Sequence, residues 1–255
     1  MTAQAMFWTV MVTAAYVATD YLEENLRVSR TYFYNAKDKA SMDTLHLEYH
    51  ELTRSFRQIQ TQIFELIDQI KNPEAHDYLK YRLGRRVIGL KKLIKRFDAF
   101  LSVEVNAKTE DDIDHILFDR NVYLNYYFTC ITGALDNMAW VVNLELNVGV
   151  TNPQKITLQG KEILAACSDE LVTTLKNSQN TTKHWKHFRD PAAHRIQPYS
   201  PPYLVDEESG EKHFLSVYTM NPGKSFVAKF HGQMISDLKT LDLIILSFIK
   251  MMRVN

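Results

Sequence analysis

The most constraining feature of the sequence is a helical periodicity that covers two long neighbouring segments. From Leu45 to Ile70, apolar residues recur at alternating spacings of four and three, and the same pattern returns from Leu83 to Leu101. This spacing places the apolar side chains on one face of an α-helix. Because Asn72-Pro73 interrupts the pattern between the segments, we expect two long helices that pack as an antiparallel hairpin.

The rest of the chain predicts further helices and one small β element. Apolar stripes at helical spacing run from Leu124 to Val142 and from Val227 to Met252. Between them we expect a loop at 147–159, a shorter helix at 160–176 and a polar linker at 177–182. Two short apolar runs, 203–205 and 214–218, flank Glu208-Ser209-Gly210-Glu211 and predict a β-hairpin. The fold class expected is therefore all-α: an antiparallel multi-helix bundle with a small β-hairpin insertion near 203–219.

Composition limits the classes of partner. The 30 basic and 30 acidic side chains cancel, so any binding of RNA must come from a local patch and not from bulk charge. The two cysteines, Cys130 and Cys167, form no disulfide framework, which favours a cytoplasmic protein. The apolar stretch Ala3–Ala18, within a first helix expected at 2–26, is shorter than the ~20 residues of a membrane span. We expect no membrane partner.

The passage from His184 to Tyr203 concentrates histidines, basic residues and prolines. Asp190 is a good N-cap and Pro191 suits the first helical position, so we expect a helix to begin at Asp190. That start would make Arg189 and His194 neighbours. The helix dipole beneath them favours an anion such as phosphate.

The motif Arg189-Asp190-Pro191-Ala192-Ala193-His194 resembles the signature of the HEPN superfamily, an arginine, a small polar residue, three free positions and a histidine. The resemblance implies one helical domain over 1–255, with a HEPN-like core at 108–255 and a helical extension, the long helix hairpin, at 1–107. It also implies a homodimer and a metal-independent endoribonuclease, with a role in stress response or defence. Arg189, His194 and Asp190 would be the catalytic residues, and no cofactor is expected.

Chemistry gives the two principal residues their roles. Cleavage of RNA without a metal needs a proton acceptor for the ribose 2′-hydroxyl, which His194 could supply, and a cation for the developing charge, which Arg189 could supply. The alternative is structural: Arg189 pairs with an acidic side chain and His194 caps a packing face. A zinc site formed by the nearby histidines lacks a convincing ligand set. The second function hypothesis is a non-catalytic helical module that binds a nucleotide, RNA or a protein through the same site.

Further side chains are candidates for contacts around the motif. The candidates for binding RNA phosphates are Arg195, His187, Lys186, Tyr199, Arg85, Lys92 and Arg96. The last three lie on the second long helix, where a solvated face is the other reading. Asp136 and Asn137 lie just off an apolar stripe, either as an ordinary polar pair or as partners that orient Arg189 or His194.

Overall fold

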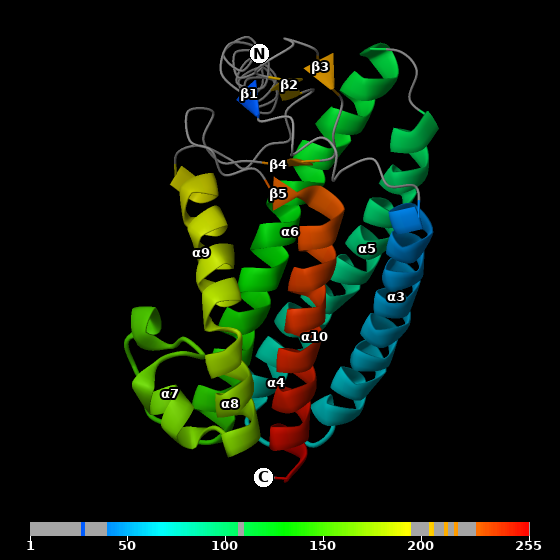
Figure 1. Ribbon diagram of the computed structural model, residues 1–255. Coiled ribbons are helices and arrows are strands. Elements are labelled where there is room, and N and C mark those ends of the chain that lie inside the picture. The colour runs from blue at the N-terminus through cyan, green and yellow to red at the C-terminus, as the bar shows by residue number, and fades with distance from the viewer. Residues whose placement is uncertain are drawn as a thin grey trace, which may run out of the picture.

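The computed structural model describes the backbone of residues 27–28, 40–106, 110–194, 204–206, 212–213, 217–218 and 228–254. Side chains are described for 43–101, 118–186 and 230–254. The described part of the chain is mostly helical, which confirms the all-α class (Figure 1). The first helix expected at 2–26 lies outside the described residues.

The first long helix, α3, spans Ala40–Ile67. The chain then turns into α4 (Pro73–Asp77), a π-helical stretch η1 (Tyr78–Leu83) and α5 (Gly84–Asn106). Asn72 starts α4 because its side-chain oxygen accepts hydrogen bonds from two backbone N–H groups, at 2.9 and 3.1 Å. Helices α3 and α5 lie side by side, and α6 (Glu110–Glu145) packs on the other side of α5.

The second half of the chain begins with the short helix η2 (Pro153–Lys155), α7 (Lys161–Ala166) and α8 (Asp169–Asn177). The single helix expected at 160–176 is therefore wrong. The helix is interrupted at Cys167-Ser168. The Ser168 hydroxyl accepts a hydrogen bond from the backbone N–H of Leu171 at 3.4 Å and so caps α8.

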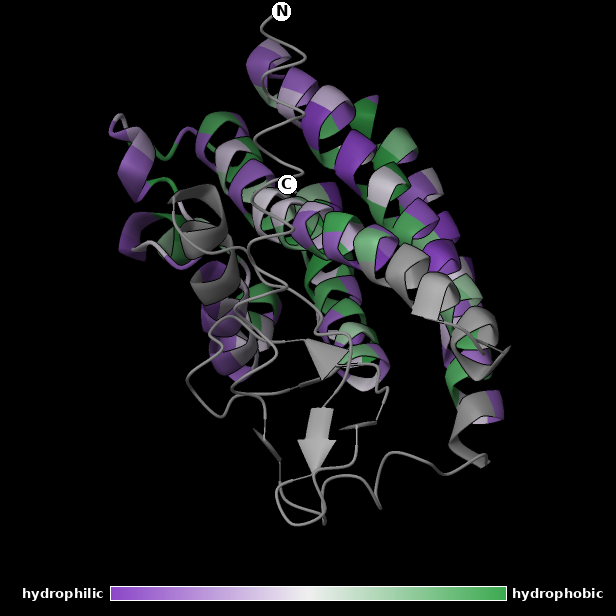
Figure 2. Ribbon diagram, turned by 90° about the horizontal axis from the view of Figure 1, so that it is seen from above, coloured by the Kyte–Doolittle hydropathy of each residue, from purple (hydrophilic) through white to green (hydrophobic). Residues whose placement is uncertain are grey.

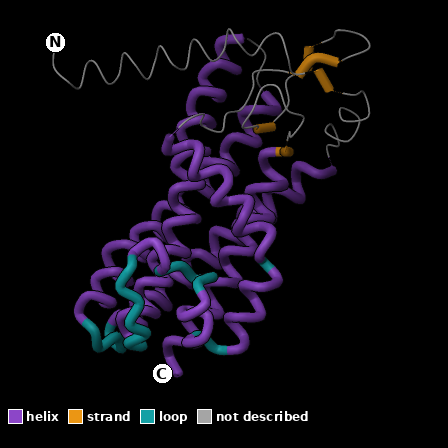
Figure 3. Tube along the Cα trace, turned by 90° about the vertical axis from the view of Figure 1, so that its left-hand side faces the viewer, coloured by secondary structure: helices purple, strands orange, loops and turns teal. Residues whose placement is uncertain are grey.

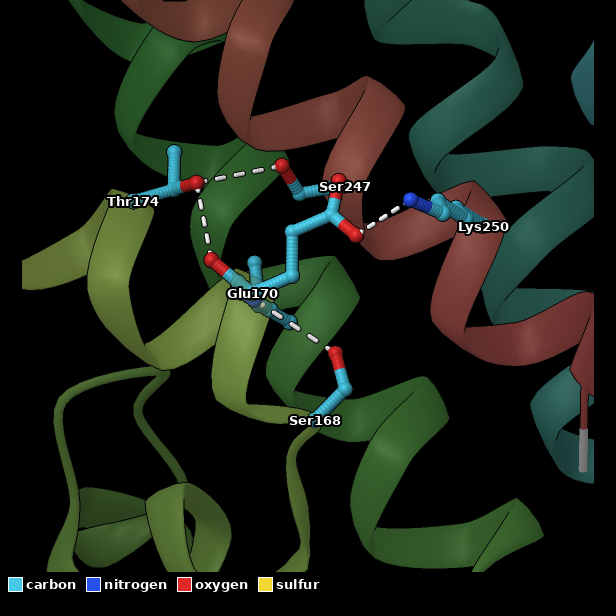
Figure 4. Close-up of polar contacts among 6 residues, drawn as sticks. Ser168, Glu170, Thr174, Ser247 and Lys250 are labelled. Atoms are coloured by element: carbon cyan, nitrogen blue, oxygen red, sulfur yellow. Dashed lines mark hydrogen bonds and ion pairs between the residues drawn. The ribbon is translucent and has the colours of Figure 1, made fainter.

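Helix α8 is tied to the last helix, α10 (Phe230–Val254), by polar contacts (Figure 4). The Lys250 ammonium donates to the Glu170 carboxylate at 2.5 Å, and the hydroxyls of Thr174 and Ser247 lie 3.2 Å apart. The Thr174 hydroxyl also donates to the Glu170 carbonyl at 2.9 Å. These contacts hold α8 against the C-terminal helix.

Short strands gather at the end of the helical body opposite the C-terminus (Figures 1 and 3). They are β1 (Arg27–Val28), β2 (Leu204–Asp206), β3 (Lys212–His213), β4 (Val217–Tyr218) and β5 (Ala228–Lys229). Strand β2 pairs with β1 in parallel and with β3 in antiparallel, and β4 pairs with β5. The hairpin expected between 203–205 and 214–218 is thus not supported, because those two segments pair with other partners.

The core lies between the long helices, whose apolar sides mostly face one another (Figure 2). Phe97 of α5 contacts Tyr127 of α6 and Phe230 of α10 edge to face, with ring centroids 5.6 and 5.1 Å apart. Such aromatic pairs add to the free energy gained by burial itself. This cluster joins α5, α6 and α10. Helix α9 (Gln179–His194) packs on α6 of this group.

Candidate functional site

Helix α9 carries the whole Arg189–His194 motif. It begins at Gln179, so the prediction that a helix starts at Asp190 and the prediction of a linker at 177–182 are both wrong. Tertiary packing explains the early start. Thr182 and Trp185 are completely buried on one face of α9, and the Thr182 hydroxyl both accepts from Gln159 Nε2 at 2.6 Å and donates to the Gln179 carbonyl at 3.1 Å.

A continuous helix changes the geometry expected of the motif. The neighbouring arrangement of Arg189 and His194 depended on a helix that starts at Asp190, and that premise is wrong. Two positions five residues apart on an α-helix differ by about 140° around its axis. The side chains of Arg189, Asp190, His194 and His187 lie outside the described residues, as do Arg195 and Tyr199 entirely.

Lys186 and Asp136 are brought together, as far as the described residues show. Both line a small hollow between α6, α8, α9 and the loop before α7, whose other lining residues are Leu135, Thr157, Leu158, Gln159, Leu175 and Thr182. The hollow is too confined for a nucleotide. Asn137, the residue after Asp136, is buried, and its side-chain nitrogen has no hydrogen-bond acceptor among the described residues.

Arg85, Lys92 and Arg96 lie elsewhere. All three are exposed on α5, which packs against α3 and α6, whereas α9 packs against α6 and α8. None of the three lines the hollow that contains Lys186. The structure therefore places these cations on a separate surface from Lys186, with α6 in contact with both helices.

A buried carboxyl group was not identified from the sequence. Asp237 of α10 has an exposed fraction of 0%, and its Oδ1 accepts from Gln233 Nε2 at 2.8 Å. The Trp185 indole of α9 approaches it, but neither Trp185 Nε1 nor Asp237 Oδ2 lies within hydrogen-bond distance of a partner among the described residues. Burial raises the pKa of Asp237 to about 7. The only signal in the sequence was an acidic residue inside the apolar stripe of the last helix.

Other chemistry finds little support among the described side chains. Burial raises the pKa of the Cys167 thiol to about 11, so this group is protonated at neutral pH and is a poor nucleophile. No group of three His, Cys, Asp or Glu side chains within 43–101, 118–186 and 230–254 could hold a metal ion. None of the described helices combines the length and the apolar composition that crossing a membrane requires.

Comparison of the chain with protein-family models, with curated proteins and with solved structures finds no match.

Proposed function

We propose that this chain is a metal-independent endoribonuclease of the HEPN type, built as an antiparallel helical bundle and acting in the cytoplasm in stress response or defence. The observation that carries the proposal is the position of the complete motif on the last turns of α9, a helix that packs on α6 within the segment that resembles the HEPN core. His194 accepts the proton of the ribose 2′-hydroxyl, and Arg189 binds the phosphoryl oxygens. Asp190 is the polar residue of the motif.

The course of α9 favours a site shared between two copies of the chain. Positions 189 and 194 differ by about 140° around a continuous helix, so they do not share one face of α9. In a two-fold dimer with the motifs facing one cleft, Arg189 of one copy and His194 of the other can meet. The same helical geometry favours the second candidate, a non-catalytic binding module, if the chain acts as a monomer.

Subunit mixing tests the shared site. Arg189→Ala and His194→Ala should each abolish cleavage of RNA in the presence of a chelator, while Lys183→Ala, an exposed residue on the same helix, should not. Mixing the two inactive variants should restore about a quarter of the wild-type activity. Half of the randomly assorted dimers are mixed, and each mixed dimer holds one complete site of two.

The controls separate the two candidate functions. Light scattering measures whether the protein is a dimer, and circular dichroism measures whether each variant keeps its helix content. Inactive mixtures of folded dimeric variants would place the site within one copy. A wild-type protein that cleaves no RNA would rule out the endoribonuclease and leave the binding module.

A further inference from the structure

The seam between α6 and the continuous stretch η1–α5 carries alternating aromatic and cationic side chains. Near the end at Tyr78, the Arg82 guanidinium lies over the Tyr78 ring at 4.4 Å from its centroid. Tyr78 in turn stacks on Trp140 of α6, with ring centroids 5.1 Å apart and planes 11° from parallel. Three flat groups from both sides of the seam thus form one stack.

The next turn continues the same chemistry with a more exposed ring. Tyr81 is 49% exposed, and it lies beneath Lys80 at 5.0 Å and Arg85 at 5.7 Å. Arg86 crosses to α6 and donates to the Thr129 carbonyl at 2.8 Å. Two cations therefore lie over an exposed aromatic ring, one helical turn along from Tyr78.

Toward its other end, the seam again pairs an arginine with a tyrosine. Arg96 of α5 lies over the Tyr123 ring of α6 at 6.0 Å. Tyr126, which is 49% exposed, rests against Gly89 of α5, where an added Cβ would lie 2.7 Å from the tyrosine oxygen. The glycine lets the phenol end of this ring approach the neighbouring helix closely. The aromatic–basic seam is defined here by six of its residues, Tyr78, Tyr81, Arg82, Arg85, Arg96 and Tyr126.

The arginines of the seam are not paired with acidic side chains in the part of the chain whose side chains the structure describes. Within the described side chains, neither its three arginines nor Arg86 takes part in an ion pair, whereas Lys239, Lys250 and Arg253 on α10 each pair with a glutamate. The chain as a whole has no net charge. An uncompensated row of cations on such a chain marks a surface complementary to a polyanion.

We propose that the aromatic–basic seam binds single-stranded RNA. Bases stack on the exposed rings and on the guanidinium planes, and the arginines contact phosphates, which is the combination that single-strand binding requires. Positions 78 to 96 span about 27 Å at ~1.5 Å per residue, room for about eight stacked nucleotides at ~3.4 Å each. The choice of RNA as the ligand rests on the proposed function, but binding at the seam does not depend on cleavage.

Charge reversal tests the phosphate contacts in the 255-residue chain that carries Arg189→Ala and His194→Ala, two substitutions that remove the proposed cleavage from the measurement. The probe is a mixed-sequence single-stranded RNA of about 16 nucleotides, about twice the number that the length of the seam accommodates. Arg85→Glu/Arg96→Glu should weaken binding and lower the slope of log K against log salt by about 1.4, or ~0.7 for each lost contact. The matched control is Arg54→Glu/Arg57→Glu, two exposed arginines on α3, which should bind like the parent.

Ring removal tests the stacking. Tyr81→Ala should weaken binding about tenfold, and Phe64→Ala, a residue of similar exposure (47%) on α3, should not. RNA duplex should bind more weakly than the single strand, because its bases are not free to stack on protein rings. Equal affinity for duplex, or equal effects of the seam and control variants, would overturn the proposal.

Two further outcomes distinguish this proposal from the endoribonuclease. Binding at the seam without any cleavage by the wild-type chain would refute catalysis and support the seam. Cleavage by wild type with seam variants that bind RNA like their controls would overturn the seam and leave catalysis standing. A chain that binds no single-stranded RNA would overturn the seam proposal.

Discussion

Asp237 should make the stability of the protein fall as the pH rises through neutrality. The carboxyl group is fully buried on α10 with one hydrogen bond, from Gln233, and no cation among the partners that set its pKa. Burial raises its pKa from 3.8 to about 7, because the charged form loses its hydration. The folded protein therefore holds this proton more tightly than the unfolded chain does.

The sign and size of the effect follow from linkage. Below about pH 4 Asp237 is protonated in both the folded and the unfolded state, so it does not change the free energy of unfolding. Between about pH 4 and about pH 7 the unfolded chain is ionised and the folded protein is not, so the free energy of unfolding decreases with each step in pH. At about 1.36 kcal/mol for each unit of pKa difference, the loss reaches about 4 kcal/mol above pH 7.

Asp237→Asn should remove this dependence, because an amide stays neutral. The amide adds two N–H donors where the neighbouring Trp185 Nε1 is itself a donor without an acceptor. An unsatisfied buried donor costs about 1–3 kcal/mol. The variant should therefore be more stable than wild type by about 1–3 kcal/mol at about pH 8, and equal to it or less stable at about pH 5.

Urea denaturation followed by circular dichroism across this pH range measures the difference. The control is Asp68→Asn, which makes the same chemical change at an exposed position on the turn after α3 and should leave the wild-type profile unchanged. Parallel pH profiles for wild type and Asp237→Asn would show that Asp237 does not titrate in this range and would refute the reasoning.

Two further predictions concern local structure. The Glu145 carboxylate accepts from the backbone N–H groups of Lys71 and Asn72 at 3.0 and 2.8 Å, so Glu145→Ala should lower the free energy of unfolding by about 1–3 kcal/mol, measured in urea. An added Cβ at Gly160 would lie 2.8 and 3.0 Å from two backbone carbonyl oxygens, whereas one at Gly232 meets nothing within 4 Å. Gly160→Ala should therefore destabilise the protein by about 1–3 kcal/mol. Gly232→Ala, within α10, should stabilise it by up to about 1 kcal/mol. Equal effects of the two substitutions in thermal melts would contradict the packing argument.

The long helices were predictable because their signals are local and repeated. The stripe in α3 places Leu52, Phe56 and Ile59 in the core, each at most 3% exposed. Asn72, expected to end the first helix pattern, caps the next helix through its side chain. Periodic burial and capping act within a few residues, so one sequence contains the information for both.

The start of α9 was not predictable in this way. Asp190-Pro191 is a genuine local signal for a helix start. However, Thr182 and Trp185 are buried on α9 although the residues around them in the sequence are mostly polar. The Thr182 hydroxyl is satisfied in the core by the Gln179 carbonyl of its own helix and by Gln159, from the loop before α7. Contacts between distant segments outweighed the local capping preference, and the motif geometry inferred from that cap changed with it.

The aromatic–basic seam shows a different limit of prediction from sequence. Its residues can be read from the sequence, but the side chains that they contact in the folded protein cannot. Helical spacing alone spreads the cations of α5 around an arc, which is as consistent with a solvated face as with a binding track. The partners of these cations favour the second reading. Arg82 and Arg96 lie over rings, and Arg96 reaches Tyr123 on another helix. The charge of a cation that is paired with a carboxylate is neutralised. A cation that lies over an aromatic ring keeps its net charge, which can still attract a phosphate. The register of α5 on α6 is therefore what turns a charge pattern into a specific hypothesis about RNA.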